Sequence, residues 1–374
     1  MDNAFKNLNS GRANFVLMVF ICVIIGGGVL KITAPVVLPL VIAILLAFVL
    51  YPIVLALEKI RVPRVISISL AVIIMFVALS IFGIVLFSSG KVIVDRFLQS
   101  EKSLTNIYER LAQIFDDLSY DDELSFFQNV WGQFGVGKIS SVVVPFFNDF
   151  MGFAKNALLV VLFVAFLLVE AFHFNDKLDV AYNKRSDTIK KMGSDIISQV
   201  TRYLGAKFLI SLANGVIFAV SFKLVGLEHA IVWGLIQFLL NFIPTLGSIA
   251  AGAGISFFAL LQFWPDKPML IVIVVLIVLV TNMVLGNIID PKIIGDNVGI
   301  SPFVILVSLV IWGWIWGFAG MVLAVPMMVI IRIICENFPF LEPISILLGS
   351  RKSVLIKKAA LEAAAAGEAP TSQI

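Results

Sequence analysis

A group of polar and helix-breaking residues interrupts an otherwise apolar stretch near the C-terminal end of the chain. The stretch, Ala230–Phe263, holds 34 residues without a charge. Proline removes a backbone donor and glycine tolerates strained dihedral angles, so a helix is expected to break at this group. Its amides, hydroxyls and freed carbonyls have the chemistry to bind polar oxygens of a small solute. The predicted substrate-binding residues here are Asn241, Pro244, Thr245, Gly247 and Ser248.

A second uncharged run, Ser301–Ile331, holds 31 residues and carries Gly313 and Gly317 near its middle. As unbroken helices the two runs would reach about 51 and 46 Å, well beyond a hydrocarbon core of about 30 Å. Each run is therefore predicted to form two half-helices that meet at membrane depth. Unwound backbone is tolerated there only inside protein or along a wet cavity, as in secondary transporters. Gly313 and Gly317 are thus predicted to line the substrate site, with close helix packing as the alternative.

Two carboxylates are candidates for ion or proton coupling. Asp290 follows Asn287 at the end of the apolar segment that lies between the two breaks. A juxtamembrane cap, or a salt bridge with Lys292, explains Asp290 equally well. Glu170 lies near the end of another apolar segment, where an interfacial carboxylate is the simpler interpretation. Asn287 is included among the predicted substrate-binding residues.

Other polar residues lie within apolar segments. For any one of them, a hydrogen bond to a neighbouring helix is the simpler role, because an amide or hydroxyl in hydrocarbon needs a partner. The case for a site is stronger where polar groups coincide with a helix break. The polar residues are Asn214, Gln237, Asn241, Thr245, Ser248, Thr281, Asn282, Asn287 and Ser301.

The composition is that of a polytopic membrane protein. The 374 residues are 60% hydrophobic and 14% charged, with a mean hydropathy of +1.05. The net charge of +3 does not indicate a nucleic-acid partner, and Cys22 and Cys335 support neither a disulfide framework nor a metal site. Enzyme motifs are lacking, no cofactor is expected, and without a P-loop transport is predicted to follow a gradient or to be passive.

The apolar segments predict an all-α protein with a small helical outer insertion. Ala13–Leu30 resembles a signal peptide but lacks a cleavage site, so it is interpreted as a retained span. Phe208–Phe222 is short for a span, and short segments mark transporter binding regions; Lys207 before it is interpreted as a snorkelling side chain. Asn175–Arg202 is expected to be a cytoplasmic amphipathic helix. The other predicted spans are Pro35–Leu57, Val65–Gly90, Gly152–Phe172 and Met269–Ile289.

The domain boundaries follow from these segments. Residues 1–90 hold spans one to three, 91–150 an extracytoplasmic helical insertion, and 151–203 the fourth span with the amphipathic helix. Residues 204–348 form the transport core, and 349–374 a cytoplasmic tail that is expected to be disordered. An apolar stripe from Leu104 to Leu118 in the insertion is explained by packing within it or by a contact between subunits.

Two topologies fit the pattern. If both uncharged runs cross the membrane there are eight spans, and if both are re-entrant hairpins there are six. The hairpin version, which the run lengths favour, gives an inverted repeat of one span and one hairpin in each half. Both versions leave the N- and C-termini in the cytoplasm, since basic residues flank the first spans and the tail.

Several segments resemble the autoinducer-2 exporter family of bacterial membrane proteins, and the resemblance extends from Ala13 to Phe338. It is closest to the branch that exports the quorum-sensing signal. One departure is Gly252-Ala253-Gly254, where many members carry prolines, so the bend in this half of the hairpin is expected to be weaker or elsewhere. The matching segments are Arg61-Val62-Pro63-Arg64, Val232-Trp233-Gly234-Leu235, Asn241–Ser248, Gly286–Gly295, Trp312-Gly313-Trp314 and Gly320–Pro326.

The resemblance implies a multi-pass transporter of the bacterial inner membrane that forms a homo-oligomer of five subunits. The leading hypothesis is export of a small polar signal, autoinducer-2 or a similar furanone-like polyol, by alternating access. Sodium or lithium/proton antiport, known from other branches, is the alternative and would use Asp290 or Glu170. A non-transporting membrane scaffold organised by the outer insertion is a third hypothesis.

Overall fold

The protein is all-α, as its sequence predicts. The computed structural model describes residues 10–99, 157–182, 186–293, 299–338, 340–350 and 355. These residues form helices and no strand, with one isolated β-bridge between Ile300 and Gly349. The elements are α1 (Ser10–Ile32), α2 (Ala34–Lys59), α3 (Arg64–Gln99), α7 (Ala157–Tyr182), α8 (Ser186–Val225), α9 (Ala230–Leu240), α10 (Leu246–Phe263), α11 (Pro268–Asn282), the π-helix η2 (Met283–Ile289), α12 (Asp290–Ile293), α13 (Pro302–Asn337) and α14 (Glu342–Leu348).

Six helices of the described chain are long and apolar enough to cross a membrane, which confirms the predicted polytopic architecture. Two shorter apolar helices, Ala157–Phe172 and Ala230–Leu240, accompany them. The six candidate spans are Ala34–Lys59, Arg64–Ile81, Asp187–Val225, Leu246–Phe263, Pro268–Ile289 and Pro302–Asn337.

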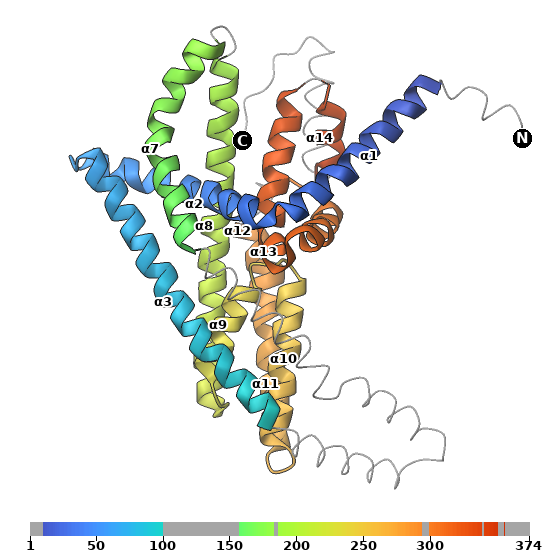
Figure 1. The fold of residues 1–374 in the computed structure, drawn as a ribbon. Coiled ribbons are helices and arrows are strands. Elements are labelled where there is room, and N and C mark those ends of the chain that lie inside the picture. The colour runs from blue at the N-terminus through green and yellow to red at the C-terminus, as the bar shows by residue number, and fades with distance from the viewer. Residues whose placement is uncertain are drawn as a thin grey trace, which may run out of the picture.

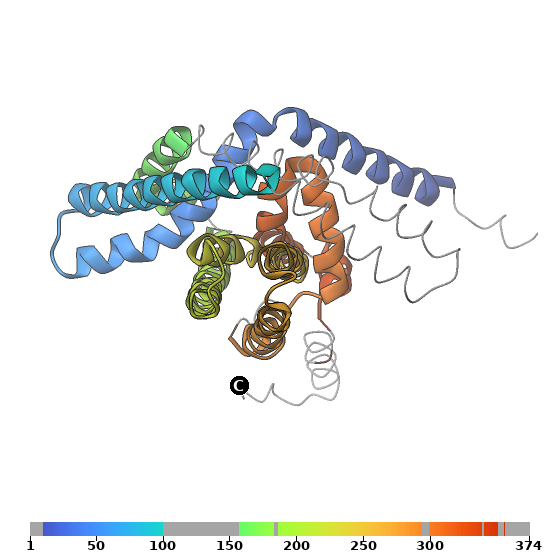
Figure 2. The same cartoon turned by 90° about the horizontal axis from the view of Figure 1, so that it is seen from below.

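The helices α8 to α11 form an upright bundle, and the N-terminal helices lie against it. Figure 1 shows α8, α10 and α11 standing along one direction, with α2 crossing them and α1 projecting away from the body. Seen along the bundle, α1, α2 and α3 run across the view (Figure 2). The long helix α8 packs against α2, α7, α9, α11 and α13, so it is the central element of the fold.

The first uncharged run folds into a helical hairpin of α9 and α10. The rings of Trp233 and Phe258 are 5.3 Å apart between centroids, whereas a straight helix would separate these residues by about 37 Å. At the base, the Gln262 side chain accepts the Glu228 N–H at 2.8 Å and donates to the Gly226 carbonyl at 2.9 Å. The predicted break at the middle of this run is therefore confirmed.

The second uncharged run also folds back on itself, within α13. The backbone leaves helical geometry at Trp316 and at Gly317, where φ is 60° and ψ is −139°. The Ser308 hydroxyl donates to the Ala324 carbonyl at 3.1 Å, although 16 residues of straight helix would place them about 24 Å apart. A positive φ favours glycine, which explains why Gly317 occupies the tip. The second predicted hairpin is thus confirmed as well.

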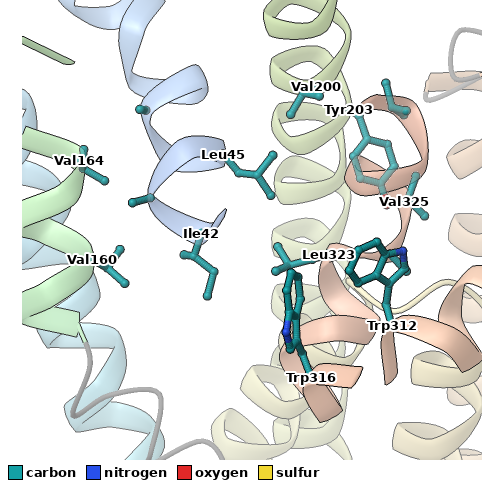
Figure 3. Packing of buried hydrophobic residues seen from close by; sticks show 14 of the residues in the cluster. Ile42, Leu45, Val160, Val164, Val200, Tyr203, Trp312, Trp316, Leu323 and Val325 are labelled. Atoms are coloured by element: carbon teal, nitrogen blue, oxygen red, sulfur yellow. The ribbon is translucent and has the colours of Figure 1, made fainter. Parts of the chain in front are cut away.

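One buried apolar cluster joins α2, α7, α8 and the tip of the α13 hairpin. Figure 3 shows Ile42 and Leu45 of α2 between Val160 and Val164 of α7 on one side and Val200 of α8 on the other. Trp312 and Trp316 of α13 belong to the same cluster, with ring centroids 4.9 Å apart. The N-terminal helices and the second hairpin therefore share one core. A second cluster, around Phe218, Phe222 and Ile255, lies among α8, α9, α10 and α11.

The structure corrects the prediction that Phe208–Phe222 is a short, separate segment. It is the C-terminal part of α8, a continuous helix of 40 residues that begins at Ser186. The predicted amphipathic helix over Asn175–Arg202 is divided between the end of α7 and the start of α8, and Lys190 of α8 pairs with Asp179 of α7 at 2.5 Å. The sequence misled because a lysine ahead of an apolar run resembles a membrane boundary, whereas Lys207 is buried.

Parts of the predicted organisation lie outside the described residues. Lys91 to Gln99 continue α3, but residues 100–150 of the predicted insertion, with the Leu104–Leu118 stripe, are not described. The same holds for the tail from residue 356. The proposed division into five domains stays a prediction, although α8 runs without a break across the boundary at residues 203 and 204.

The crossing of α8 and α9 leads to a first prediction. A Cβ on Gly234 would lie 2.5 Å from the Gly215 carbonyl oxygen, so Gly234→Ala must push two backbones apart. We expect it to lower the free energy of unfolding by about 1–3 kcal/mol, the usual cost of overpacking. Thermal unfolding in detergent, followed by circular dichroism, measures this loss.

Gly205→Ala on α8 is the matched control, because a Cβ there meets no atom within 4 Å. It should be neutral or raise stability by about 0.5–1 kcal/mol, the ordinary helical gain over glycine. Equal stability of the two variants would contradict the close approach.

Candidate functional site

Asn241 joins three helices at the tip of the first hairpin. This side chain is buried and follows the last residue of α9. Its Nδ2 donates to Ser211 Oγ of α8 at 2.9 Å, and its Oδ1 accepts from Ser248 Oγ of α10 at 3.1 Å. Asn214 Nδ2 of α8 approaches the same Oδ1 at 3.4 Å. The hairpin tip is therefore fastened to α8 by side-chain hydrogen bonds in an apolar bundle.

The tip has a tight backbone, which accounts for its breaking residues. Pro244 lies in the turn, and Thr245 has a φ of 61° immediately before α10. A Cβ on Gly247 would lie 1.7 Å from the Leu240 carbonyl oxygen, so only glycine fits there. The Thr245 side chain is exposed and makes no capping hydrogen bond. Of the predicted tip residues, Asn241 and Ser248 meet through a hydrogen bond, whereas Pro244, Thr245 and Gly247 shape the turn.

A second amide pair lies one turn of α9 away from Asn241. Gln237 Nε2 donates to Asn282 Oδ1 of α11 at 3.1 Å. The carbonyl oxygens Asn214 Oδ1 and Gln237 Oε1 are buried and accept no hydrogen bond from any residue that the structure describes. The α9 face that carries Gln237 is thus held between α8 and α11, with two amide oxygens still unsatisfied.

The amides Asn214 and Gln237 lie near the close approach of α8 and α9. A Cβ on Gly215 would lie 2.7 Å from the Gly234 carbonyl oxygen, so the two helices touch backbone to backbone. Asn214 precedes Gly215 on α8, and Gln237 follows Gly234 by one turn on α9. Small residues at a crossing allow side-chain amides of membrane helices to hydrogen-bond across it.

A buried ion pair lies on the same face of α8. Lys207 Nζ is 2.8 Å from Asp290 Oδ2, and the side chains are 3% and 21% exposed. The other carboxylate oxygen, Asp290 Oδ1, is buried and accepts no hydrogen bond within the described part of the chain. Lys207 does not snorkel, and Asp290 pairs with Lys207 rather than Lys292, which corrects both interpretations drawn from sequence. The physical reason is that a buried ammonium needs a counter-charge within the protein.

The contribution of α8 to this site was not predicted from the sequence. Lys207, Ser211 and Asn214 follow one another at spacings of four and three, so they form a polar stripe along one helical face. This spacing is visible in the sequence, but a lysine ahead of an apolar run also fits a membrane boundary. Ser211 gives no separate signal, because serines are common in membrane helices.

Helical geometry changes immediately before Asp290. Residues Met283–Ile289 form a π-helix between α11 and α12. Such segments often accompany functional sites, because the wider turn redirects the side chains that follow. Asn287 lies in this π-helix and is exposed, so it is not part of the Asn241 network.

The second hairpin tip differs in chemistry from the first. A Cβ on Gly313 would lie 2.9 Å from Met321 Cγ, which is a contact between the two legs. Trp316 Nε1 donates to the Leu30 carbonyl of α1 at 3.1 Å, and Lys31 lies 4.2 Å from the Trp314 ring. Gly313 and Gly317 therefore shape an aromatic tip that contacts the end of α1.

Glu170 does not take part in this polar network. Its side chain is about half exposed and pairs with Lys177, seven residues further along α7. In the described part of the chain, no three His, Cys, Asp or Glu side chains gather in a way that would hold a metal ion. Of the two predicted coupling carboxylates, Asp290 is therefore the one that pairs with α8, through Lys207, which lies one helical turn from Ser211.

Comparison with known proteins finds similarity to transport proteins. The sequence signature described as AI-2E family transporter matches residues 15–340. A "Putative transport protein" of Borreliella burgdorferi is 32% identical over 93% of this chain and 94% of its own length. A relative of the same description from Haemophilus influenzae is 30% identical over 92% of this chain and 98% of its own. The AI-2 transport protein TqsA of Escherichia coli is 26% identical over 89% and 94%.

The Lys207–Asp290 pair leads to a second prediction. Lys207→Met leaves a mostly buried carboxylate without its counter-charge, so we expect a loss of about 3 kcal/mol in the free energy of unfolding, the lower end for a broken buried pair. Adding Asp290→Asn should recover part of the loss, because no uncompensated charge then remains. Thermal unfolding in detergent measures both variants.

Lys223→Met is the control, since Lys223 is an exposed lysine near the end of the same helix. It should change the free energy of unfolding by less than about 0.5 kcal/mol. A loss in Lys207→Met no larger than in this control would show that the ion pair contributes nothing to stability.

Proposed function

Because the chain belongs to the AI-2E transporter family, which makes it a membrane transporter, we propose that it exports a small polar signal, autoinducer-2 or a similar furanone-like polyol. The observation that carries the proposal is the polar network of Ser211, Asn214, Asn241 and Ser248 at a helix break inside an apolar bundle. Such networks at interrupted helices are where secondary transporters bind solutes. The relative TqsA, named as an AI-2 transport protein, supports this choice of substrate.

The proposed mechanism is alternating access around the two hairpins. Ile243 of the first tip lies in the same buried cluster as Trp312 and Trp316 of the second, so a displacement of one tip would be felt by the other. The first tip supplies polar groups to the solute, and the second tip supplies an aromatic surface linked to α1 by the Trp316 hydrogen bond. Movement of one hairpin relative to α8 would then expose the network to alternate sides of the membrane.

A second candidate, sodium or lithium/proton antiport, is favoured by one specific observation. Asp290 combines a salt bridge to buried Lys207 with a second oxygen that has no partner among the described residues. A titratable carboxylate with a free oxygen near the site is what cation or proton coupling requires. The same pair would equally couple export to a proton or sodium gradient.

We further propose that the protein resides in a bacterial inner membrane with both termini in the cytoplasm and forms a homo-oligomer of five subunits. Basic residues around the first spans and in the tail support the orientation. The family resemblance supports the assembly.

Flux measurements in proteoliposomes test the proposed function. Vesicles containing the full chain should accumulate or release labelled autoinducer-2 faster than empty vesicles. Imposed proton and sodium gradients, each applied alone, then identify the coupling ion. Flux equal to that of empty vesicles under every gradient would contradict the proposal.

The hairpin tips lead to a third prediction. Gly317→Leu places a side chain at a φ of 60°, and Pro244→Ala loosens the turn beside Asn241. Both variants should lower autoinducer-2 flux by at least about 10-fold, because the tips shape the site. Size-exclusion chromatography should show the same oligomer as the unchanged protein. Normal flux in well-folded variants would contradict the role of the breaks.

A fourth prediction separates export from antiport. If antiport is the function, vesicles will show sodium-dependent proton movement that disappears in Asp290→Asn, with no autoinducer-2 flux in either protein. If proton-coupled export is the function, Asp290→Asn will abolish stimulation by the gradient, while downhill autoinducer-2 flux persists. Fluorescent pH indicators inside the vesicles measure the proton movement.

A further inference from the structure

We propose that Asn214 and Gln237 form a subsite that binds hydroxyl groups of an uncharged solute. The proposal rests on the proposed function and deepens it, because it assigns residues and a chemical class to the solute. Asn214 is 1% and Gln237 0% exposed. Each uses its NH₂ group in a bond to another amide, and each keeps a carbonyl oxygen to which no described residue donates.

The unsatisfied oxygens are energetically significant. Leaving a buried acceptor unpaired is destabilising, and folded proteins rarely do so without a functional reason. Two such groups flanking one helix crossing, at Gly215 and Gly234, point to a molecule that satisfies them. A hydroxylated solute supplies the donors that these oxygens lack.

The amide chemistry selects hydroxyl groups. The NH₂ groups of Asn214 and Gln237 are already bonded to Asn241 and Asn282, so the two unsatisfied atoms are acceptors that need a donor. A hydroxyl donates a hydrogen bond without carrying a charge. A carboxylate only accepts, so it satisfies neither oxygen.

The surrounding charges favour an uncharged solute. The groups bonded to Asn214 and Gln237 are Asn241 and Asn282, which are neutral. Lys207 lies two helical turns from Asn214 on α8, and its charge is already paired with Asp290. A charged solute buried here would lack a counter-charge and carry a large desolvation cost.

A competition experiment tests the subsite in proteoliposomes that contain the full chain. Uptake of labelled autoinducer-2 is measured in the presence of increasing amounts of either the unlabelled compound or an analogue with one hydroxyl replaced by hydrogen. We expect the deoxy analogue to compete at least about 10-fold more weakly, because a site built for a hydroxyl rejects the compound that lacks it. A carboxylated analogue should compete no better than the deoxy one.

The variants Asn214→Leu and Gln237→Leu remove the amides with little change in volume. Each should reduce uptake at least about 10-fold and bring the parent and deoxy compounds within about 2-fold of each other. Asn337→Leu is the control, because Asn337 is an amide at the end of α13 that donates to the Ile333 carbonyl. It should keep the full discrimination between the two compounds.

The outcomes separate the two proposals. Absence of uptake by the unchanged protein would contradict the proposed function, and the subsite with it. Uptake by the unchanged protein without dependence on the hydroxyl would overturn the subsite alone, whether or not the leucine variants fold. A second measurement compares thermal unfolding with and without Na⁺. The subsite is also overturned if Na⁺ stabilises the unchanged protein and the leucine variants lose this stabilisation but keep hydroxyl selectivity, since the amide oxygens would then bind Na⁺.

Discussion

The backbone contact between α8 and α9 at Gly215 and Gly234 holds the candidate site together. Because no side chain separates the helices, the two carbonyls lie where Cβ atoms would clash, and the flanking amides come within hydrogen-bonding reach. Asn214 then meets Asn241, which in turn binds Ser211 and Ser248. A wider crossing would leave these polar groups unpaired among apolar side chains, at a cost that the bundle could not recover elsewhere.

The two hairpins use the same structural device with different chemistry. Each begins after a glycine of positive φ, Gly226 or Gly299, and turns at a residue of positive φ, Thr245 or Gly317. A long polar side chain lies at each base, since Gln262 bridges the ends of the first hairpin and the Arg332 guanidinium lies against Gly299 in the second.

Different residues at the two tips then give different surfaces. The first tip presents amides and hydroxyls to α8, whereas the second presents tryptophans to α1 and to the core. Polar groups can recognise a solute by hydrogen bonding, and an aromatic tip can pack against its apolar side or transmit movement to α1. The shared cluster around Ile243 and Trp312 gives the hairpins a common apolar contact through which such movement would pass.

The central position of α8 connects the ion pair with the amide network. Lys207, Ser211 and Asn214 lie on one face, so Asp290 and Asn241 approach the same helix within two turns. Loss of the Asp290 partner would leave an uncompensated buried charge on Lys207, and the ion pair therefore fixes α12 against α8. The π-helix before Asp290 is the nearby element with irregular backbone geometry.

The sequence by itself determined the all-α membrane class, the two breaks and the family. Uncharged runs longer than a bilayer must bend, and Pro244, Gly247 and Gly317 mark where, because their backbone requirements are local. Only the tertiary structure decided which polar groups meet. Lys207 and Asp290 are 83 residues apart in the sequence, and Gln237 and Asn282 are 45 residues apart. Such pairings depend on how helices cross, and neither hydropathy nor spacing along one helix contains that information.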